Sequence, residues 1–296
     1  MNFDFLVAGA YFAGWRLVRI LPEKIAYSFF QNIGKLALAR NGSSIKRLRS
    51  NLSRVRPELN QIEMDQLMRE AINSYMRYWC DTFRSPDWSS NRISKTVKVT
   101  REELLVDPMR NGTGVIVALP HAGNWDHAGS YFCAMGFPLV TVAERLKPEA
   151  LFKKFLEYRQ NIGMEVLPLD SRSMATLLMR AREGGLIALV ADRDLSRSGV
   201  DVNFFGYPAR MPAGPALIAI RTGTPLITAY VSYTHDGIHI EFNSIAIPSE
   251  GSESERVAKV VQLCADQFAV GIKRSPQDWH MLQRIWIDGD FQERSA

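Results

Sequence analysis

Residues 114–127 read GVIVALPHAGNWDH, and this stretch indicates both a fold class and the place of a site. Its first part, residues 115–119, is a short apolar run of the kind that forms buried strands. Its second part carries Gly123 and Asn124, which suit a tight turn and a helix start. A strand that leads through a turn into a helix is the unit from which α/β proteins are built. Sites in such proteins lie where strands end, and His121 stands at that point.

Apolar runs and helical patterns continue to alternate along the rest of the chain. The predicted strands are 115–119, 139–143, 166–169, 186–191, 226–233 and 239–247. The predicted helices are 125–135, 149–162, 173–183, 214–222 and 253–273. This alternation predicts an α/β fold with a mostly parallel central sheet flanked by helices.

The beginning of the chain has a different pattern. Apolar residues recur with helical spacing over residues 3–40, with a break at Pro22, and again over residues 62–83. Lys and Arg outnumber Asp and Glu by 36 to 31 overall, and the first 60 residues hold ten of the former against three of the latter. These helices either cover the core or dip into lipid headgroups, and their basic character suits an anionic membrane surface.

Composition and length limit the classes of protein. Hydrophobic residues make up 46% and charged residues 23% of the chain, so a largely disordered protein is excluded. The apolar run 5–15 would be about 16 Å long as a helix, roughly half of a bilayer's hydrocarbon core, and no other run is long enough to cross. Nothing resembles a nucleic-acid-binding module. We expect one domain over residues 1–296, with a helical, membrane-facing part, 1–85, and an α/β catalytic core, 112–290.

The cysteines carry no recognisable motif. Cys80, Cys133 and Cys264 are an odd number of isolated residues without a CxxC pair. This pattern argues against a disulfide framework or a structural zinc site, and favours inert thiols in a reducing compartment.

His121 and Asp126 are the residues with the clearest chemical meaning. With His121 on the turn and Asp126 in the first helical turn, the two side chains can meet. A carboxylate that binds one imidazole nitrogen leaves the other as a base. The chain has no GxSxG nucleophile elbow, so a substrate hydroxyl is expected to attack directly. A metal site of His121, Asp126 and His127 is the alternative, although no HExxH motif supports it.

HAGNWD resembles the H-x4-D motif of the glycerolipid and lysophospholipid acyltransferase superfamily. The closer resemblance is to its bacterial branch of late lipid A and phosphatidylinositol mannoside acyltransferases, and it covers most of residues 1–288. The segments ADRDL and MPAGPA favour the phosphatidylinositol mannoside acyltransferases over the lipid A enzymes. The segments that carry the resemblance are LPHAGNWDHAG, AERLKPEALFKKFLEYRQNIGMEVLPL, LVADRDLSRSGVDVNFFGYPARMPAGPALIAIRTGTPL and QDWHMLQRIW.

The resemblance implies an O-acyltransferase that uses an acyl-coenzyme A. A long chain, palmitoyl, would pass to a mannose hydroxyl of a phosphatidylinositol mannoside, with His121 as general base, Asp126 orienting it, and no covalent acyl-enzyme. The acyl-coenzyme A is then a substrate, and neither a cofactor nor a metal is expected. Such an enzyme would lie peripherally on the cytoplasmic face of the plasma membrane. A lipid A-type or other glycolipid acyltransferase and an acyl-coenzyme A thioesterase are the alternatives.

The resemblance also implies a set of substrate-binding residues. Glu144 and Arg159 would otherwise form a structural ion pair, and Arg210 would otherwise be a solvated loop residue. Asp201 stands where the family favours glutamate, so its reach is shorter by one methylene. Candidates for contact with the acyl chain are Leu119, Trp125, Phe204 and Phe205. The complete predicted substrate-binding set is Glu144, Arg145, Arg159, Asp192, Arg193, Asp194, Asp201 and Arg210.

Overall fold

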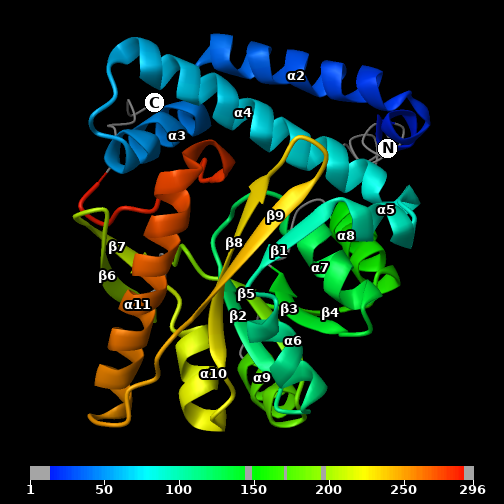
Figure 1. Ribbon diagram of the computed structural model, residues 1–296. Coiled ribbons are helices and arrows are strands. Elements are labelled where there is room, and N and C mark those ends of the chain that lie inside the picture. The colour runs from blue at the N-terminus through cyan, green and yellow to red at the C-terminus, as the bar shows by residue number, and fades with distance from the viewer. Residues whose placement is uncertain (1–13, 144–148, 170–171, 195–197, 290–296) are drawn as a thin grey trace.

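The computed structural model describes residues 14–143, 149–169, 172–194 and 198–289. At its centre lies a seven-stranded sheet, flanked on both faces by helices (Figure 1). Its strand order is β1 (Val97–Thr100), β9 (Ile238–Ser244), β8 (Leu226–Tyr233), β2 (Val115–Leu119), β5 (Leu186–Val190), β3 (Leu139–Ala143) and β4 (Met164–Pro168). All neighbouring strands are parallel except β8 and β9, which form an antiparallel hairpin. The predicted α/β fold class is confirmed.

The alternation of side chains along β2 shows how the two core layers form. Ile116 and Ala118 point into the larger apolar core, whereas Val115, Val117 and Leu119 point into the smaller one. The larger core is closed by α9 (Ser173–Arg182), α10 (Gly214–Thr222) and α11 (Glu253–Arg274). The smaller core is closed by α6 (Glu103–Arg110) and α7 (Trp125–Ala134). Because both faces of β2 are buried, its sequence is a continuous apolar run.

A helical layer covers the end of the sheet at which β2 runs into α7. Residues 14–20 are helical, and α2 (Glu23–Arg40) begins directly after Pro22, as the predicted break requires. α3 (Ser43–Val55) and α4 (Gln61–Arg84) follow, and α2 and α4 lie side by side (Figure 1). A capping box of Asn60 and Glu63 fixes the start of α4. The short η1 (Ser85–Asp87) and α5 (Ser90–Lys95) lead from α4 to the edge strand β1.

Most elements lie where the sequence pattern predicts them. Every predicted strand is present with its ends shifted by at most three residues, and the predicted helices of the core agree equally well. The unpredicted elements are α3, α5, α6, the edge strand β1 and the antiparallel ribbon of β6 (Val200–Phe204) and β7 (Tyr207–Met211). The predicted helix over residues 3–13 lies outside the described residues.

Asn51 joins the helical layer to the segment that follows α11. Its amide N–H groups donate to the carbonyl oxygens of Met281 at 2.7 Å and Gln283 at 3.1 Å, and its oxygen accepts from the Trp286 indole at 2.8 Å. Asn51 and Trp286 are both fully buried. Water therefore cannot replace these bonds.

We expect Asn51→Ala to lower the free energy of unfolding by about 3 kcal/mol, because it strands a buried indole N–H and two carbonyl groups. Urea unfolding followed by circular dichroism measures this change. Asn32→Ala on the exposed side of α2 is the control, since the side chain of Asn32 accepts an exposed hydrogen bond from Lys35 at 3.4 Å. Equal stability of the two variants would contradict the structural role of Asn51.

Candidate active site

His121 lies on a turn that only glycine can complete. Gly123 has a φ of +57°, and a Cβ at this position would lie 2.6 Å from the carbonyl oxygen of Val231. The N–H of Gly123 donates to the carbonyl oxygen of Asp278 at 2.8 Å. Asn124 then caps α7 by accepting from the N–H of His127 at 2.9 Å. The turn is therefore fixed against β8, α7 and the segment after α11.

The imidazole of His121 is held by Asp192. Nδ1 of His121 lies 2.6 Å from Oδ1 of Asp192, and the backbone N–H of His121 donates to Oδ2 at 3.0 Å. The indole N–H of Trp279 donates to the same Oδ2 at 2.8 Å. Burial alone would raise the pKa of Asp192, but His121 and these hydrogen bonds hold it below its ordinary value. An ionised Asp192 favours the neutral tautomer of His121 with the proton on Nδ1, in which Nε2 is the nitrogen that can accept a proton.

Asp126 does not take the place predicted for it. Its carboxylate accepts from Nε of Arg159 at 2.9 Å, from Nη2 at 3.2 Å, and from the hydroxyl of Tyr78 at 3.2 Å. The carboxylate that contacts the ring of His121 is therefore that of Asp192 and not that of Asp126. The reason is the start of α7: it directs Asp126 towards α4 and α8 (Glu149–Asn161), while His121 lies beside the carboxyl end of β5.

Arg159 forms an ion pair with Asp126. Glu144, with which a structural ion pair was the alternative to a site role, lies outside the described residues, as does Arg145. Burial lowers the pKa of Arg159, but the nearby carboxylate of Asp126 outweighs burial and the net shift is upward. Arg159 therefore remains a partly buried cation near His121.

Aromatic rings surround the base. Trp125 meets the His121 ring edge to face at 5.7 Å and stacks on Tyr78 at 4.3 Å, measured between ring centroids. The backbone N–H of His280 donates to the carbonyl oxygen of His121 at 2.7 Å. Burial lowers the pKa of His280 to about 3, so its ring is neutral at any physiological pH. His280 packs at the site, with its ring near those of Tyr78 and Trp125.

A pocket of about 790 Å³ opens at His121, whose side chain is 39% exposed. Polar groups gather near the base, and apolar side chains form much of the remaining wall. Arg193 and Asp194 line this pocket as well, and Arg193 donates to the carbonyl oxygen of Arg284 at 3.1 Å. The apolar lining comprises Leu119, Leu139, Val142, Ala143, Phe152, Leu156, Met164, Leu169, Ala188, Leu189 and Val190.

Two predicted substrate-binding residues lie on the ribbon of β6 and β7. Asp201 and Arg210 face each other across this ribbon and form an ion pair with an Nε–Oδ1 distance of 2.5 Å. Neither is among the residues that line the pocket of His121. Of the acyl-chain candidates, Leu119 and Trp125 line the pocket, whereas Phe204 is packed in the core against Trp279 and Trp286.

Within residues 14–143, 149–169, 172–194 and 198–289, no three His, Cys, Asp or Glu side chains gather closely enough to hold a metal ion. The polar groups at His121 instead form two separate carboxylate clusters, one at Asp192 and one at Asp126. The arrangement can accept a proton at Nε2 of His121 and keep a partly buried cation, Arg159, nearby.

A model of the bacterial lipid A biosynthesis acyltransferases matches residues 3–287. The chain belongs to this family. Acyl transfer is therefore its chemistry, and the resemblance inferred from HAGNWD and the later segments is confirmed.

Individual members of the family are similar over nearly the full chain. The phosphatidylinositol mannoside acyltransferase of Mycolicibacterium smegmatis is 42% identical over 289 residues, which cover 97% of this chain and 93% of that protein. The phosphatidylinositol mannoside acyltransferases of two strains of Mycobacterium tuberculosis, CDC 1551 / Oshkosh and H37Rv, are each 38% identical over 292 residues. The matches cover 97% of this chain and 90% of each of those proteins.

The geometry of Asp192 predicts the effect of an isosteric change in this acyltransferase. In Asp192→Asn, an amide N–H facing Nδ1 would move the imidazole proton to Nε2 and so remove the base. We expect kcat for acyl transfer to fall about 10³-fold or more, with KM for the acyl donor changed little. Asp266→Asn on the outer side of α11 is the control. A variant of Asp192 that keeps more than a tenth of the wild-type kcat would contradict the assignment.

Proposed function

We propose that this acyltransferase moves a palmitoyl chain from its coenzyme A thioester to a mannose hydroxyl of a phosphatidylinositol mannoside. The observation that carries the proposal is His121 at the mouth of an apolar pocket, with Nδ1 bound by a buried carboxylate and Nε2 left as base. The acceptor is supported by the names of the three relatives. No cofactor takes part, and the acyl-coenzyme A is the donor substrate.

The reaction needs one proton acceptor and no covalent acyl-enzyme. Nε2 of His121 takes the proton of the mannose hydroxyl while the hydroxyl oxygen attacks the thioester carbonyl. The C–O bond forms, the C–S bond breaks, and the imidazolium returns its proton to the leaving thiolate. Asp192 stabilises the imidazolium because its negative charge lies 2.6 Å from Nδ1. Arg159, already paired with Asp126, keeps that second carboxylate from competing for the proton.

The acyl chain occupies the apolar part of the pocket. Burial contributes about 0.8 kcal/mol per methylene, so a palmitoyl chain binds there strongly. A smaller apolar cavity continues between α7 and the sheet, and it shares Leu119, Trp125, Leu139 and Ala188 with the main pocket. Arg193 at the rim gives the donor's phosphates a cation to meet.

The helical layer is the part of the protein that meets the membrane. No helix among the described residues is long and apolar enough to span a bilayer. Along α2, however, four large apolar side chains at helical spacing are between 40% and 53% exposed: Ile25, Phe29, Ile33 and Leu36. The exposed Lys24, Lys35 and Arg40 of the same helix favour anionic lipid. The protein therefore binds peripherally to the cytoplasmic face of the plasma membrane, where both lipid and acyl-coenzyme A are present.

The deciding experiment measures transfer of radiolabelled palmitoyl from coenzyme A to a purified phosphatidylinositol mannoside. We expect labelled glycolipid with the wild type and with His235→Ala, whose side chain is 97% exposed, and none with His121→Ala. If the thioester were consumed at the same rate without acceptor, the protein would be a thioesterase and the proposal would be wrong. If a lipid A precursor were acylated in preference to the mannoside, the proposed acceptor would be wrong.

The exposed side chains of α2 predict how binding to vesicles responds to substitution. In Phe29→Ser/Ile33→Ser, we expect affinity for vesicles that contain phosphatidylglycerol to fall at least about ten-fold, because apolar area no longer enters the lipid. Co-sedimentation measures this affinity. Ile62→Ser is the control, since Ile62 is 78% exposed but lies at the start of α4. An equal loss in the control, or no loss in the double variant, would contradict membrane binding through α2.

A further inference from the structure

Asp81 is a further buried carboxylate beside the site, and no step of the proposed reaction uses it. It lies in the last turns of α4 and is 2% exposed. Burial raises its pKa, and contacts with Tyr27, Arg77, Asn124 and Tyr233 oppose this shift. A charge buried at this depth is tolerated only with several partners, and each of these partners comes from a different part of the chain or a different turn of α4.

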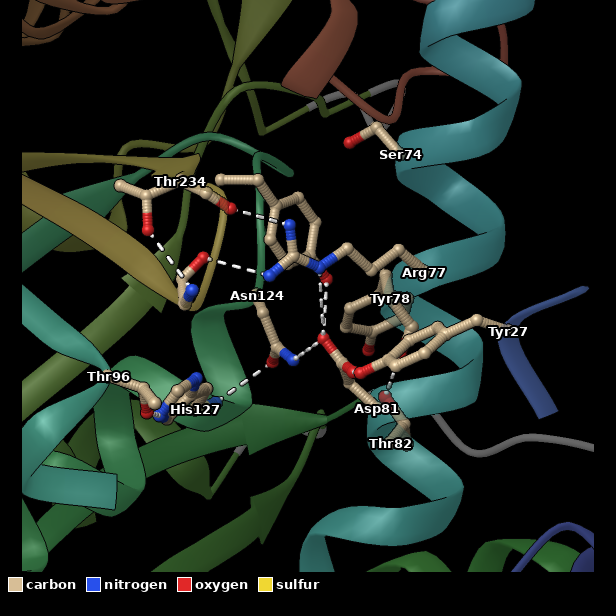
Figure 2. A network of polar contacts seen from close by, with 12 residues as sticks. Tyr27, Ser74, Arg77, Tyr78, Asp81, Thr82, Thr96, Asn124, His127 and Thr234 are labelled. Atoms are coloured by element: carbon tan, nitrogen blue, oxygen red, sulfur yellow. Dashed lines mark hydrogen bonds and ion pairs between the residues drawn. The ribbon is translucent and has the colours of Figure 1, made fainter. Parts of the chain in front are cut away.

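Figure 2 shows Tyr27, Arg77 and Asn124 converging on Asp81. Its Oδ1 accepts from the hydroxyl of Tyr27 on α2. Its Oδ2 accepts from the Tyr233 hydroxyl at the end of β8 at 3.2 Å, and lies 3.8 Å from Nε of Arg77. Arg77 in turn donates to the carbonyl oxygen of Thr234 at 2.7 Å, which fixes the β8–β9 hairpin against α4. Asp81 thus joins α2, α4 and the hairpin.

The fourth partner belongs to the turn that carries the base. Nδ2 of Asn124 points to Oδ2 of Asp81 at 3.4 Å, while its Oδ1 accepts from the N–H of His127 (Figure 2). Asn124 is 1% exposed and stands between His121 and Asp126 in the sequence. The two polar atoms of its amide therefore have different partners. The oxygen caps the start of α7, and the nitrogen contacts Asp81 of α4.

α4 touches this turn a second time one helical turn earlier. The Tyr78 hydroxyl donates to Asp126, and the Tyr78 ring stacks on Trp125. Residues 124–126 are consequently held between two contacts from a single helix. Asp81 itself lines a separate polar cavity of about 590 Å³ and is absent from the lining of the pocket at His121. Its most direct contact with the turn of His121 is therefore the one to Asn124.

We propose that Asp81 is a positioning residue for the turn of His121, and that Tyr27 ties this position to the seating of α2. The inference rests on the proposed function, because it treats His121 as the base. The contacts form a short series. Tyr27 of α2 donates to Asp81, and Asp81 accepts from the side-chain amide of Asn124, which belongs to the turn of His121. These polar contacts connect α2, which carries the exposed Ile25, Phe29, Ile33 and Leu36, to the turn of His121.

Three variants separate positioning from simple stabilisation. Tyr27→Phe removes one hydroxyl. Asn124→Ser keeps a good helix cap but is too short to reach Asp81. Tyr131→Phe on α7 is the matched control, because it removes a comparable bond, from the Tyr131 hydroxyl to Glu102 at 2.9 Å, away from the site.

We expect kcat to fall about ten-fold in Tyr27→Phe and Asn124→Ser, with KM for palmitoyl-coenzyme A unchanged within about two-fold. The double variant should lose no more than the worse single one, because both break the same path. The control should keep its kcat while losing as much thermal stability as Tyr27→Phe. Multiplicative losses in the double variant, or a normal kcat in Tyr27→Phe, would overturn the proposal.

A spectroscopic measurement tests the inference independently of turnover. In protein labelled with 15N-histidine, the imidazole signals of His121 should shift in Tyr27→Phe, and those of His239, which bonds to Thr100 across β9 and β1, should not. Unshifted His121 signals would overturn the proposal even if activity fell. An inactive wild type would refute the proposed function, whereas the imidazole shifts would still decide the positioning role.

Discussion

The buried carboxylate of Asp192 is the charge on which the arrangement of the site depends. It is fully buried, and an unpaired ion in that place would cost several kcal/mol. Three donors satisfy it: the backbone and the imidazole of His121, and the indole of Trp279. These donors come from two distant parts of the chain, the turn after β2 and the segment after α11. The turn after β2, the end of β5 and the segment after α11 are therefore fixed to one another by a single requirement.

The same requirement explains why helices cover this end of the sheet. Asp126 and Asp81 are also buried, and the side chains that satisfy them come from α2, α4, α7, α8 and β8. An acid–base site needs an imidazole at the surface of a pocket and carboxylates shielded from water. The helical layer provides this shielding, while the pocket leaves the far side of His121 accessible to substrate.

How far the sequence predicts this architecture depends on the range over which each interaction acts. Strand β2 and the turn of His121 are predictable, because an apolar run followed by glycine and a helix cap is a local signal. β1, β6 and β7 are short and partly exposed, so they carry no long apolar run. α3 does contain a signal that was missed: its buried Ile45, Leu48, Leu52 and Val55 recur at helical spacing within a strongly basic segment.

The partner of His121 shows the limit more clearly. Asp126 is near in sequence, whereas Asp192 is near only because β2 and β5 are neighbours. In the register of these strands Leu119 pairs with Val190, and His121 and Asp192 each lie two residues beyond this pair. Knowledge of the strand order would have placed them together. Strand order depends on long-range packing, which single-sequence periodicity does not encode.

The segment after α11 has a consequence for the synthesis of the protein. Trp279 binds Asp192, Asp278 accepts from the turn at Gly123, and Trp286 binds Asn51, so residues 278–286 hold both the base and the helical layer. These residues leave the ribosome after every strand and every α-helix of the structure. The contacts that hold the turn of His121 and Asp192 are therefore completed only after residues 278–286 have been synthesised.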